Sequence, residues 1–271
     1  LTDRVDGLKN PTFLDVDPDR SMLYALAEGA SPDGGKTGIA AAYAIDRGTG
    51  ALHPLNEEAT TSSPTCHLVL DRTRRSLFVS SYHGGMIGMS PIREDGGVGP
   101  ASDIRQHTGS SVLPVQSQPR AHSVPIDRHN RFAIACDLGL DKLIVYRLDL
   151  DAGRLIPHGE TKTAPGAGPR HGAYHPSGAF FYVINELNAT LTAYAYDEEQ
   201  GTLSEIQTVP TLPADYDGPN ACADIHISAD GRFLYGSNRG HDSIVVYRID
   251  AATGRLDYVE HTPCGGKHPR N

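Results

Sequence analysis

Residues 220–256 read NACADIHISADGRFLYGSNRGHDSIVVYRIDAATGRL and contain one complete copy of a pattern from which the fold can be predicted. A short apolar strand leads to a tight Asp-Gly turn at 230–231, and a second strand follows the turn. After a loop come a third strand at 244–247 and, beyond a Gly turn at 253–254, a fourth strand. Four short strands joined by tight turns are typical of one blade of a β-propeller.

The same pattern recurs along the whole chain. Copies begin near residues 11, 64, 119, 169 and 220, and a partial copy begins near 269. A period of about fifty residues with four strands in each copy predicts a propeller, whose blades stack to form one continuous core. We therefore expect an all-β fold of four-stranded antiparallel blades, with residues 1–271 in a single domain. Because five copies and a stub do not close an obvious ring, we expect this domain to be a fragment of a longer propeller.

Composition narrows the classes of partner. The chain has 29 glycines and 19 prolines, as many turns require, and a formal net charge of -9. That charge argues against a broad nucleic-acid surface, although a local arginine cluster can still bind a small anion. No apolar run reaches the length of a membrane span, so we expect no membrane partner. The four cysteines show no paired spacing, which favours reduced thiols and a cytoplasmic protein.

Counting from the tight turn gives a common register for the copies. Two rows of positions, eight residues before and eight residues after the turn, are expected to meet on one face near the central channel. These rows contain varied residues, whereas the strands between them keep a uniform apolar filling, and variable positions in a repeat are free to carry function. The earlier row is Thr12, Cys66, His122, Arg170 and Ala223, and the later row is Glu28, Tyr82, Leu138, Glu186 and Arg239.

Four members of these rows, His122, Arg170, Glu186 and Arg239, predict an acid/base pair and two fixed cations around one pocket. The alternative is structural, because polar residues at loop ends also cap strands and Arg–Glu pairs often join neighbouring loops. Glu28 occupies the same row as Glu186 and is a candidate second acid of the pocket. For His67, His226, His241 and Asp224, which lie near the same face, we expect strand-end hydrogen bonds, and the alternative is that they support the site residues from behind.

Several motifs resemble the seven-bladed propeller lactonases, the 6-phosphogluconolactonase-like proteins, to which the carboxy-muconate cyclases are also similar. The motifs are Arg120-Ala121-His122, Gly168-Pro169-Arg170-His171, Asn185-Glu186-Leu187, Ala223-Asp224-Ile225-His226 and Asn238-Arg239-Gly240-His241, followed by Gly266-Lys267-His268-Pro269-Arg270. The resemblance covers essentially the whole chain. It implies a seven-bladed parent fold, of which this chain covers about five blades plus partial ones, and a functional quartet at His122, Arg170, Glu186 and Arg239.

Lactone hydrolysis requires a base for water, a cation for the developing oxyanion and a hold on the rest of the substrate. Glu186 and His122 are rival candidates for the base, and the other then serves as the acid. Arg170 is the candidate oxyanion stabiliser, and Arg239, with Lys267 and Arg270, can hold a phosphate or carboxylate. His171 is a further candidate for substrate binding.

The resemblance implies a small anionic lactone as substrate, and 6-phosphogluconolactone of the pentose phosphate pathway is the first choice. A muconate-type cycloisomerase is an alternative, because its substrate is also anionic, and a non-catalytic binding platform is another. No HExxH or Cys-pair pattern is present in the sequence, so we expect neither a metal nor another cofactor. The sequence carries no signal for an oligomeric state.

Overall fold

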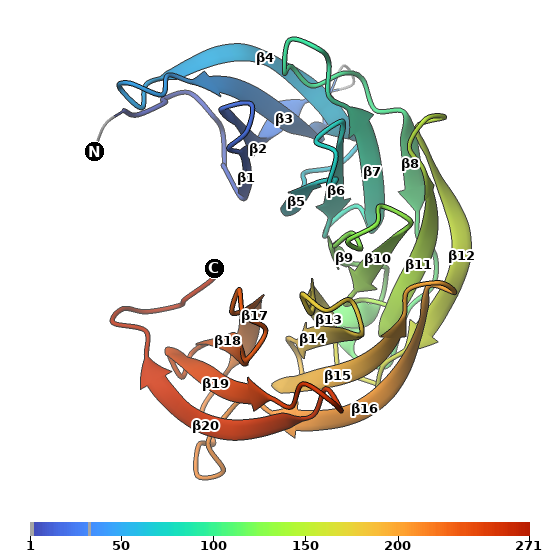
Figure 1. Ribbon diagram of the computed structural model, residues 1–271, viewed down its shortest axis with the longest axis vertical. Helices are drawn as coiled ribbons and strands as arrows, with labels where there is room; N and C mark the ends of the chain where they lie inside the picture. Colours follow the sequence, from blue (N-terminus) through green and yellow to red (C-terminus); the bar gives the residue numbers. More distant parts are fainter. Residues whose placement is uncertain (1–2, 32–33) are drawn as a thin grey trace. The chain divides into compact units, whose positions relative to one another are not determined.

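The computed structural model describes residues 3–31 and 34–271, and in these ranges the chain is built almost entirely of strands. The exception is a short 3-10 helix, η1 (Pro114–Gln116). The strands form five four-stranded sheets, and in each sheet they lie in chain order (Figure 1). The expected all-β fold of four-stranded antiparallel sheets is therefore confirmed.

The strand bounds follow the predicted copies. The first two sheets are β1 (Leu14–Asp17), β2 (Met22–Ala30), β3 (Lys36–Ile45), β4 (Leu52–Thr61), and β5 (His67–Leu70), β6 (Ser76–Ser81), β7 (Met86–Pro91), β8 (Asp103–Gln106). The third is β9 (Ala121–Ser123), β10 (Phe132–Asp137), β11 (Lys142–Asp149), β12 (Arg154–Lys162). The last two are β13 (Pro169–Tyr174), β14 (Phe180–Asn185), β15 (Thr190–Asp197), β16 (Thr202–Pro210), and β17 (Ala221–Ile227), β18 (Phe233–Arg239), β19 (Ser243–Ile249), β20 (Leu256–Pro263).

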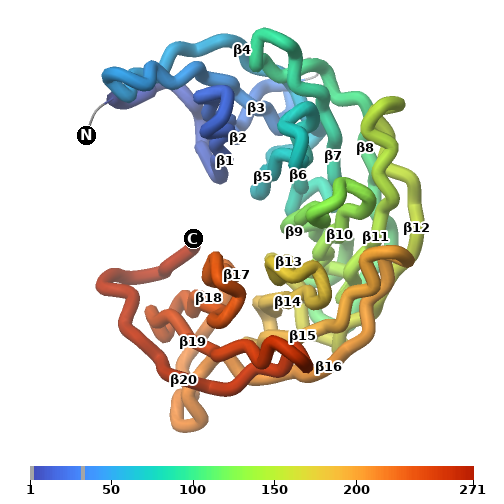
Figure 2. Tube along the Cα trace, viewed as in Figure 1, coloured from blue at the N-terminus to red at the C-terminus, as the bar shows by residue number. Residues whose placement is uncertain are grey.

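The chain divides into two compact units. The first contains residues 1–109, 119–135 and 146–157, and the second contains 110–118, 136–145 and 158–271. The first and second sheets lie in the first unit and the fourth and fifth sheets in the second, while the division passes through the third sheet. Figure 2 follows the trace of each unit from strand to strand.

The tight turns between the first two strands of each sheet have a shared local cause. A left-handed residue occurs at the predicted position in four sheets, namely Arg74 (φ 58°), Asn130 (φ 55°), Gly178 (φ 80°) and Gly231 (φ 73°), whereas the first sheet has it at Ser21 (φ 57°), one residue after Arg20. Polar side chains at the start of the turns accept backbone N–H groups: Asp71 Oδ1, for example, accepts from Arg75 and Ser76 at 2.7 Å each. Such side-chain acceptors favour a turn over a continued strand. The turn therefore fixes the common register of the five copies.

Each unit has its own apolar core, made by the alternate side chains of its sheets. In the second unit, Tyr182, Ile184 and Leu191 of the fourth sheet pack with Leu234 and Val245 of the fifth. A corresponding cluster in the first unit includes Leu26 and Leu77. Tyrosines bridge the sheets in both cores, since Tyr182 donates its hydroxyl to Gly254 O and Tyr24 donates to Gly96 O, each at 2.9 Å.

No helix in the described part of the chain is long and apolar enough to cross a membrane.

Candidate active site

Arg170 is the second residue of β13 and lies in an irregularity of that strand. The pairing of β13 with β14 shifts register between Pro169 and His171, which makes Arg170 a bulge residue. Bulges change the direction in which side chains point and are common beside functional sites. The whole of Arg170 is only 1% exposed, so its charge is held inside the second unit and requires partners there.

Glu186 and Arg239 are brought to Arg170 by the ends of neighbouring strands. Glu186 directly follows β14, and its N–H donates to Gly168 O at 2.8 Å. Arg239 is the last residue of β18. Glu186 Oε2 lies 2.9 Å from Arg170 Nε and 2.9 Å from an Nη nitrogen of Arg239, so one carboxylate oxygen is shared by two guanidinium groups.

This arrangement has more positive than negative charge. Two arginines face one carboxylate, and the side chains of Glu186 and Arg239 are still 18% and 20% exposed. Backbone carbonyl groups also hold the Arg239 side chain in place, because it donates to Ala221 O at 3.1 Å and to Cys222 O at 2.9 Å. The cluster can therefore receive an anion from solvent while its cations keep their positions. Three members of the predicted quartet thus come together in the second unit.

Behind Arg170 lies a chain of hydrogen bonds through two histidines and an aspartate. Arg170 donates to Ala223 O, and one of its Nη nitrogens lies 3.3 Å from His171 Nε2. His171 Nδ1 lies 2.7 Å from Asp224 Oδ1, and His226 Nε2 lies 3.0 Å from Asp224 Oδ2. A second register shift, between Cys222 and Ile225 of β17, accommodates Asp224 at this point. β13 and β17 contact each other along this line (Figure 1).

Burial and charge set the protonation of this chain. Burial, and then the charge of Arg170, lower the pKa of His171 to about 4 against the opposing effect of Asp224. Burial raises the pKa of Asp224, but the hydrogen bonds from His171 and His226 outweigh burial and hold that pKa well below its usual range. The hydrogen bond to Asp224 raises the pKa of His226. At neutral pH, therefore, His171 is a neutral imidazole and Asp224 is a carboxylate.

His122 lies in β9, in the first unit, and is 4% exposed. Its ring centroid is 5.6 Å from that of Tyr82, over whose face Arg120 Cζ lies at 4.8 Å. Cys66 Sγ is 3.9 Å from His122 Nδ1. Three members of the predicted rows, Cys66, Tyr82 and His122, thus lie together in the first unit. The convergence of His122 with the three residues of the second unit stays a prediction.

The other candidates have different surroundings. Glu28 of the first unit binds Lys9 Nζ at 2.9 Å and Lys36 Nζ at 3.1 Å, and hydrogen bonds from these lysines lower its pKa to about 2. Lys267 and Arg270 are exposed on the segment after β20, which is joined to the β18–β19 loop by a 2.9 Å bond from His268 N to Asp242 Oδ1. His171 is 3% exposed and therefore contacts its neighbours more than solvent. The substrate-binding roles of Glu28, His171, Lys267 and Arg270 stay predictions.

The part that Asp224 takes in the candidate site is not predicted by the two rows. Asp224 falls in neither row, because the row position in its copy is Ala223, and strand alternation places neighbours on opposite faces. The bulge in β17 breaks this alternation. Two signals in the sequence point to Asp224: its position near the same face, and the Asp-x-His spacing of Asp224 and His226, which puts both on the same side of a strand. The expected strand-end hydrogen bonds of Asp224 and His226 are confirmed.

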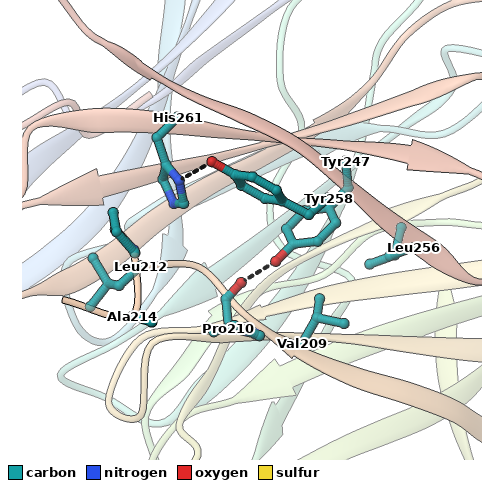
Figure 3. A pocket seen from close by; sticks show the side chains of 9 residues that line it. Val209, Pro210, Leu212, Ala214, Tyr247, Leu256, Tyr258 and His261 are labelled. Atoms are coloured by element: carbon teal, nitrogen blue, oxygen red, sulfur yellow. Dashed lines mark hydrogen bonds between the residues drawn. The ribbon is translucent and has the colours of Figure 1, made fainter. Parts of the chain in front are cut away.

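A separate cavity of about 440 Å³ lies at the outer part of the fourth and fifth sheets (Figure 3). Its lining is mostly apolar and includes Pro210, Leu212 and Tyr247. The polar groups in its wall bind one another: Tyr258 Oη lies 2.9 Å from His261 Nδ1, and His261 Nε2 lies 2.9 Å from Thr211 O. None of the predicted catalytic residues lines this cavity.

Within residues 3–31 and 34–271, no group of three or more His, Cys, Asp or Glu side chains is arranged to hold a metal ion.

The chain as a whole matches a known protein family. The model of the family described as "Lactonase, 7-bladed beta-propeller" matches residues 1–271. The 6-phosphogluconolactonase of Bacillus subtilis is 35% identical over 264 residues, which are 97% of this chain and 74% of that protein. The 6-phosphogluconolactonase of Formosa agariphila is 33% identical over 277 residues, covering 100% of this chain and 77% of the relative.

A solved structure agrees with the sequence comparisons. The periplasmic gluconolactonase of Pseudomonas aeruginosa superposes with a TM-score of 0.90 at 32% identity, over 99% of this chain and 76% of that one. Together with the full-length match to the family model, the five four-stranded sheets show that this chain belongs to the seven-bladed β-propeller lactonase family.

Proposed function

We propose that this protein hydrolyses a sugar lactone and that 6-phosphogluconolactone is its substrate. The observation that carries the proposal is the Glu186 carboxylate shared by Arg170 and Arg239, at 2.9 Å from each. This cluster supplies the groups that the reaction requires: a carboxylate as proton acceptor and two fixed cations for anionic oxygens. The 6-phosphogluconolactonases among the relatives support the choice of substrate.

In the proposed reaction, a water oxygen attacks the lactone carbonyl carbon while a base takes one of its protons. Both ion pairs of Glu186 use Oε2, so Oε1 is the atom that we assign to the water. The negative charge that develops on the carbonyl oxygen is stabilised by Arg170, whose position is fixed before the reaction begins. The ring C–O bond then breaks, and the leaving alkoxide takes up the proton that Glu186 has accepted from the water.

Arg239 is the assigned ligand for the substrate's phosphate. Its side chain is more exposed than that of Arg170, and a guanidinium can bind two phosphate oxygens at once. Lys267 and Arg270 are proposed to add positive charge around the same phosphate group. The excess of positive over negative charge in the cluster favours a phosphorylated lactone over a neutral one.

The test is hydrolysis of freshly prepared 6-phosphogluconolactone, followed by acid release with the purified protein. We expect a rate well above spontaneous hydrolysis, and a loss of about 100-fold or more in both Arg239→Ala and Glu186→Gln. Arg255→Ala is the matched control, because Arg255 is an exposed arginine in the β19–β20 turn of the same unit. Full activity of Glu186→Gln would remove Glu186 from the mechanism.

Two further substrates separate the alternatives. Unphosphorylated gluconolactone, the substrate named for the Pseudomonas relative, measures how much the phosphate contributes. Equal kcat/KM for the two lactones contradicts phosphate recognition. Turnover of a muconate, seen as loss of its ultraviolet absorbance, together with no lactone hydrolysis overturns the lactonase proposal in favour of a cycloisomerase.

A further inference from the structure

Within the second unit, the buried guanidinium of Arg170 has an ion-pair partner at Nε and two hydrogen-bond acceptors at one Nη nitrogen. Glu186 Oε2 faces Nε, while Ala223 O and His171 Nε2 face the same Nη nitrogen. A guanidinium has five N–H donors and no acceptor. The His171 Nε2 atom at 3.3 Å must therefore be the acceptor of that contact and carries no proton.

The proton of His171 is consequently on Nδ1. A neutral imidazole has one N–H, and with Nε2 as acceptor the Nδ1–H donates to Asp224 Oδ1 at 2.7 Å. Asp224 is in turn held by hydrogen bonds of two backbone N–H groups. Its N–H donates to Ser237 Oγ at 2.9 Å, and the N–H of Ile225 donates to Asp224 Oδ1 at 3.0 Å.

We propose that His171 and Asp224 are positioning residues for Arg170, an inference that rests on the lactonase function proposed above. Asp224 fixes the imidazole of His171 in the Nδ1–H tautomer. The unprotonated Nε2 then accepts a hydrogen bond from the Arg170 guanidinium and holds it against Glu186. Neither residue is required to touch the substrate.

The neutral His171 between Asp224 and Arg170 preserves the positive charge of the cluster. If Asp224 contacted Arg170 directly, it would neutralise the guanidinium, and the cluster would lose its excess of positive charge. Because His171 stands between them, Arg170 receives a hydrogen-bond acceptor without a full counter-charge in contact. The arrangement fixes the direction of the arginine and leaves its charge available to an anionic oxygen.

Two substitutions at His171 separate its two contacts. The amide oxygen of Gln in His171→Gln reaches about as far as Nε2 and can still accept from Arg170, whereas the shorter Asn in His171→Asn keeps only the link to Asp224. We expect His171→Asn to lower kcat on 6-phosphogluconolactone by up to about 100-fold with little change in KM, because a small misplacement of a catalytic group costs that much. His171→Gln is expected to retain most of the rate.

The corresponding pair at position 224 is Asp224→Ala and Asp224→Asn. The Ile225 N–H directs the oxygen of the Asn amide toward His171, so Asp224→Asn keeps the tautomer and rescues the rate relative to Asp224→Ala. His175→Gln is the control for loss of a buried histidine, since His175 binds Ser177 and Gly231 O at the far end of the same segment. It is expected to lower the melting temperature and leave kcat unchanged.

A measurement independent of activity is ¹⁵N NMR of the His171 side chain. We expect a protonated Nδ1 and an unprotonated Nε2 in the wild type and in Asp224→Asn, and a mixture of tautomers in Asp224→Ala. A protonated Nε2 in the wild type, or equal rates for His171→Gln and His171→Asn, would overturn the proposal. A wild type that shows the expected tautomer but hydrolyses no lactone would instead contradict the proposed function.

Discussion

At the scale of single residues, the site depends on which charges are paired and which are only hydrogen-bonded. Glu186 is paired with two arginines, whereas Asp224 binds two histidines of different protonation behaviour. His171 is buried and His226 has a side chain that is 74% exposed. The same carboxylate therefore stabilises a neutral imidazole on one side and favours a protonated one on the other.

The lowered pKa of His171 predicts that the stability of the protein depends on pH. This pKa is near 6.5 in the unfolded chain and about 4 in the folded protein, so between these values the unfolded state binds more protons. The free energy of unfolding is therefore expected to fall as the pH is lowered from about 6.5 to about 4, by about 3 kcal/mol at most. The raised pKa of His226 acts above this window and the lowered pKa of Asp224 below it.

Denaturant titrations at several pH values measure this effect. His171→Gln is expected to give a shallower decrease of unfolding free energy between pH 6.5 and 4 than the wild type. Identical slopes for the two proteins would show that His171 takes up its proton equally in both states.

At the scale of elements, loops and bulges place the site residues on otherwise regular sheets. Gly240 follows Arg239 and has φ 113°, and a Cβ at this residue would lie 2.1 Å from Pro219 O. Glycine is therefore required for the chain to leave β18 at the point where Arg239 meets Glu186. The bulge at Arg170 likewise breaks the regular pairing of β13 and changes the direction of the Arg170 side chain.

Gly240→Ala is expected to destabilise the protein by about 1–3 kcal/mol, because it forces strain on the backbone. It should also lower lactonase activity by displacing Arg239. Gly159→Ala is the control, since a Cβ on Gly159 in β12 meets no atom within 4 Å. Melting temperature and kcat/KM of the two variants test this, and equal behaviour would contradict the assigned role of the loop.

At the scale of the whole molecule, the net charge of -9 contrasts with the positive cluster of the candidate site. Screening over about 10 Å lets the local arginines determine the binding of a small anion. The sequence repeat predicts a single domain over residues 1–271, and the two units contain separate apolar clusters that include Leu26 and Leu234.

The single-domain prediction is tested by unfolding. Leu26→Ala and Leu234→Ala each remove a side chain that is fully buried, at an expected cost of about 2–5 kcal/mol. If the chain unfolds as one domain, both variants shift one transition, seen together by circular dichroism and calorimetry. Two transitions, each moved by only one of the variants, would show two domains.

The strands, the turns and the family can be predicted from the amino-acid sequence, because these depend on local alternation, on turn residues such as Asp71 and Gly231, and on a period of about fifty residues. The sequence also selected Arg170, Glu186 and Arg239, because equal spacing from equivalent turns brings strand ends to equivalent places. Two features are seen only in the folded protein: Glu186 Oε2 joins both arginines, and Asp224 binds His171. The physical reason is the two bulges, at Arg170 and at Ala223–Asp224, which break the two-residue alternation and are stabilised by contacts between different sheets.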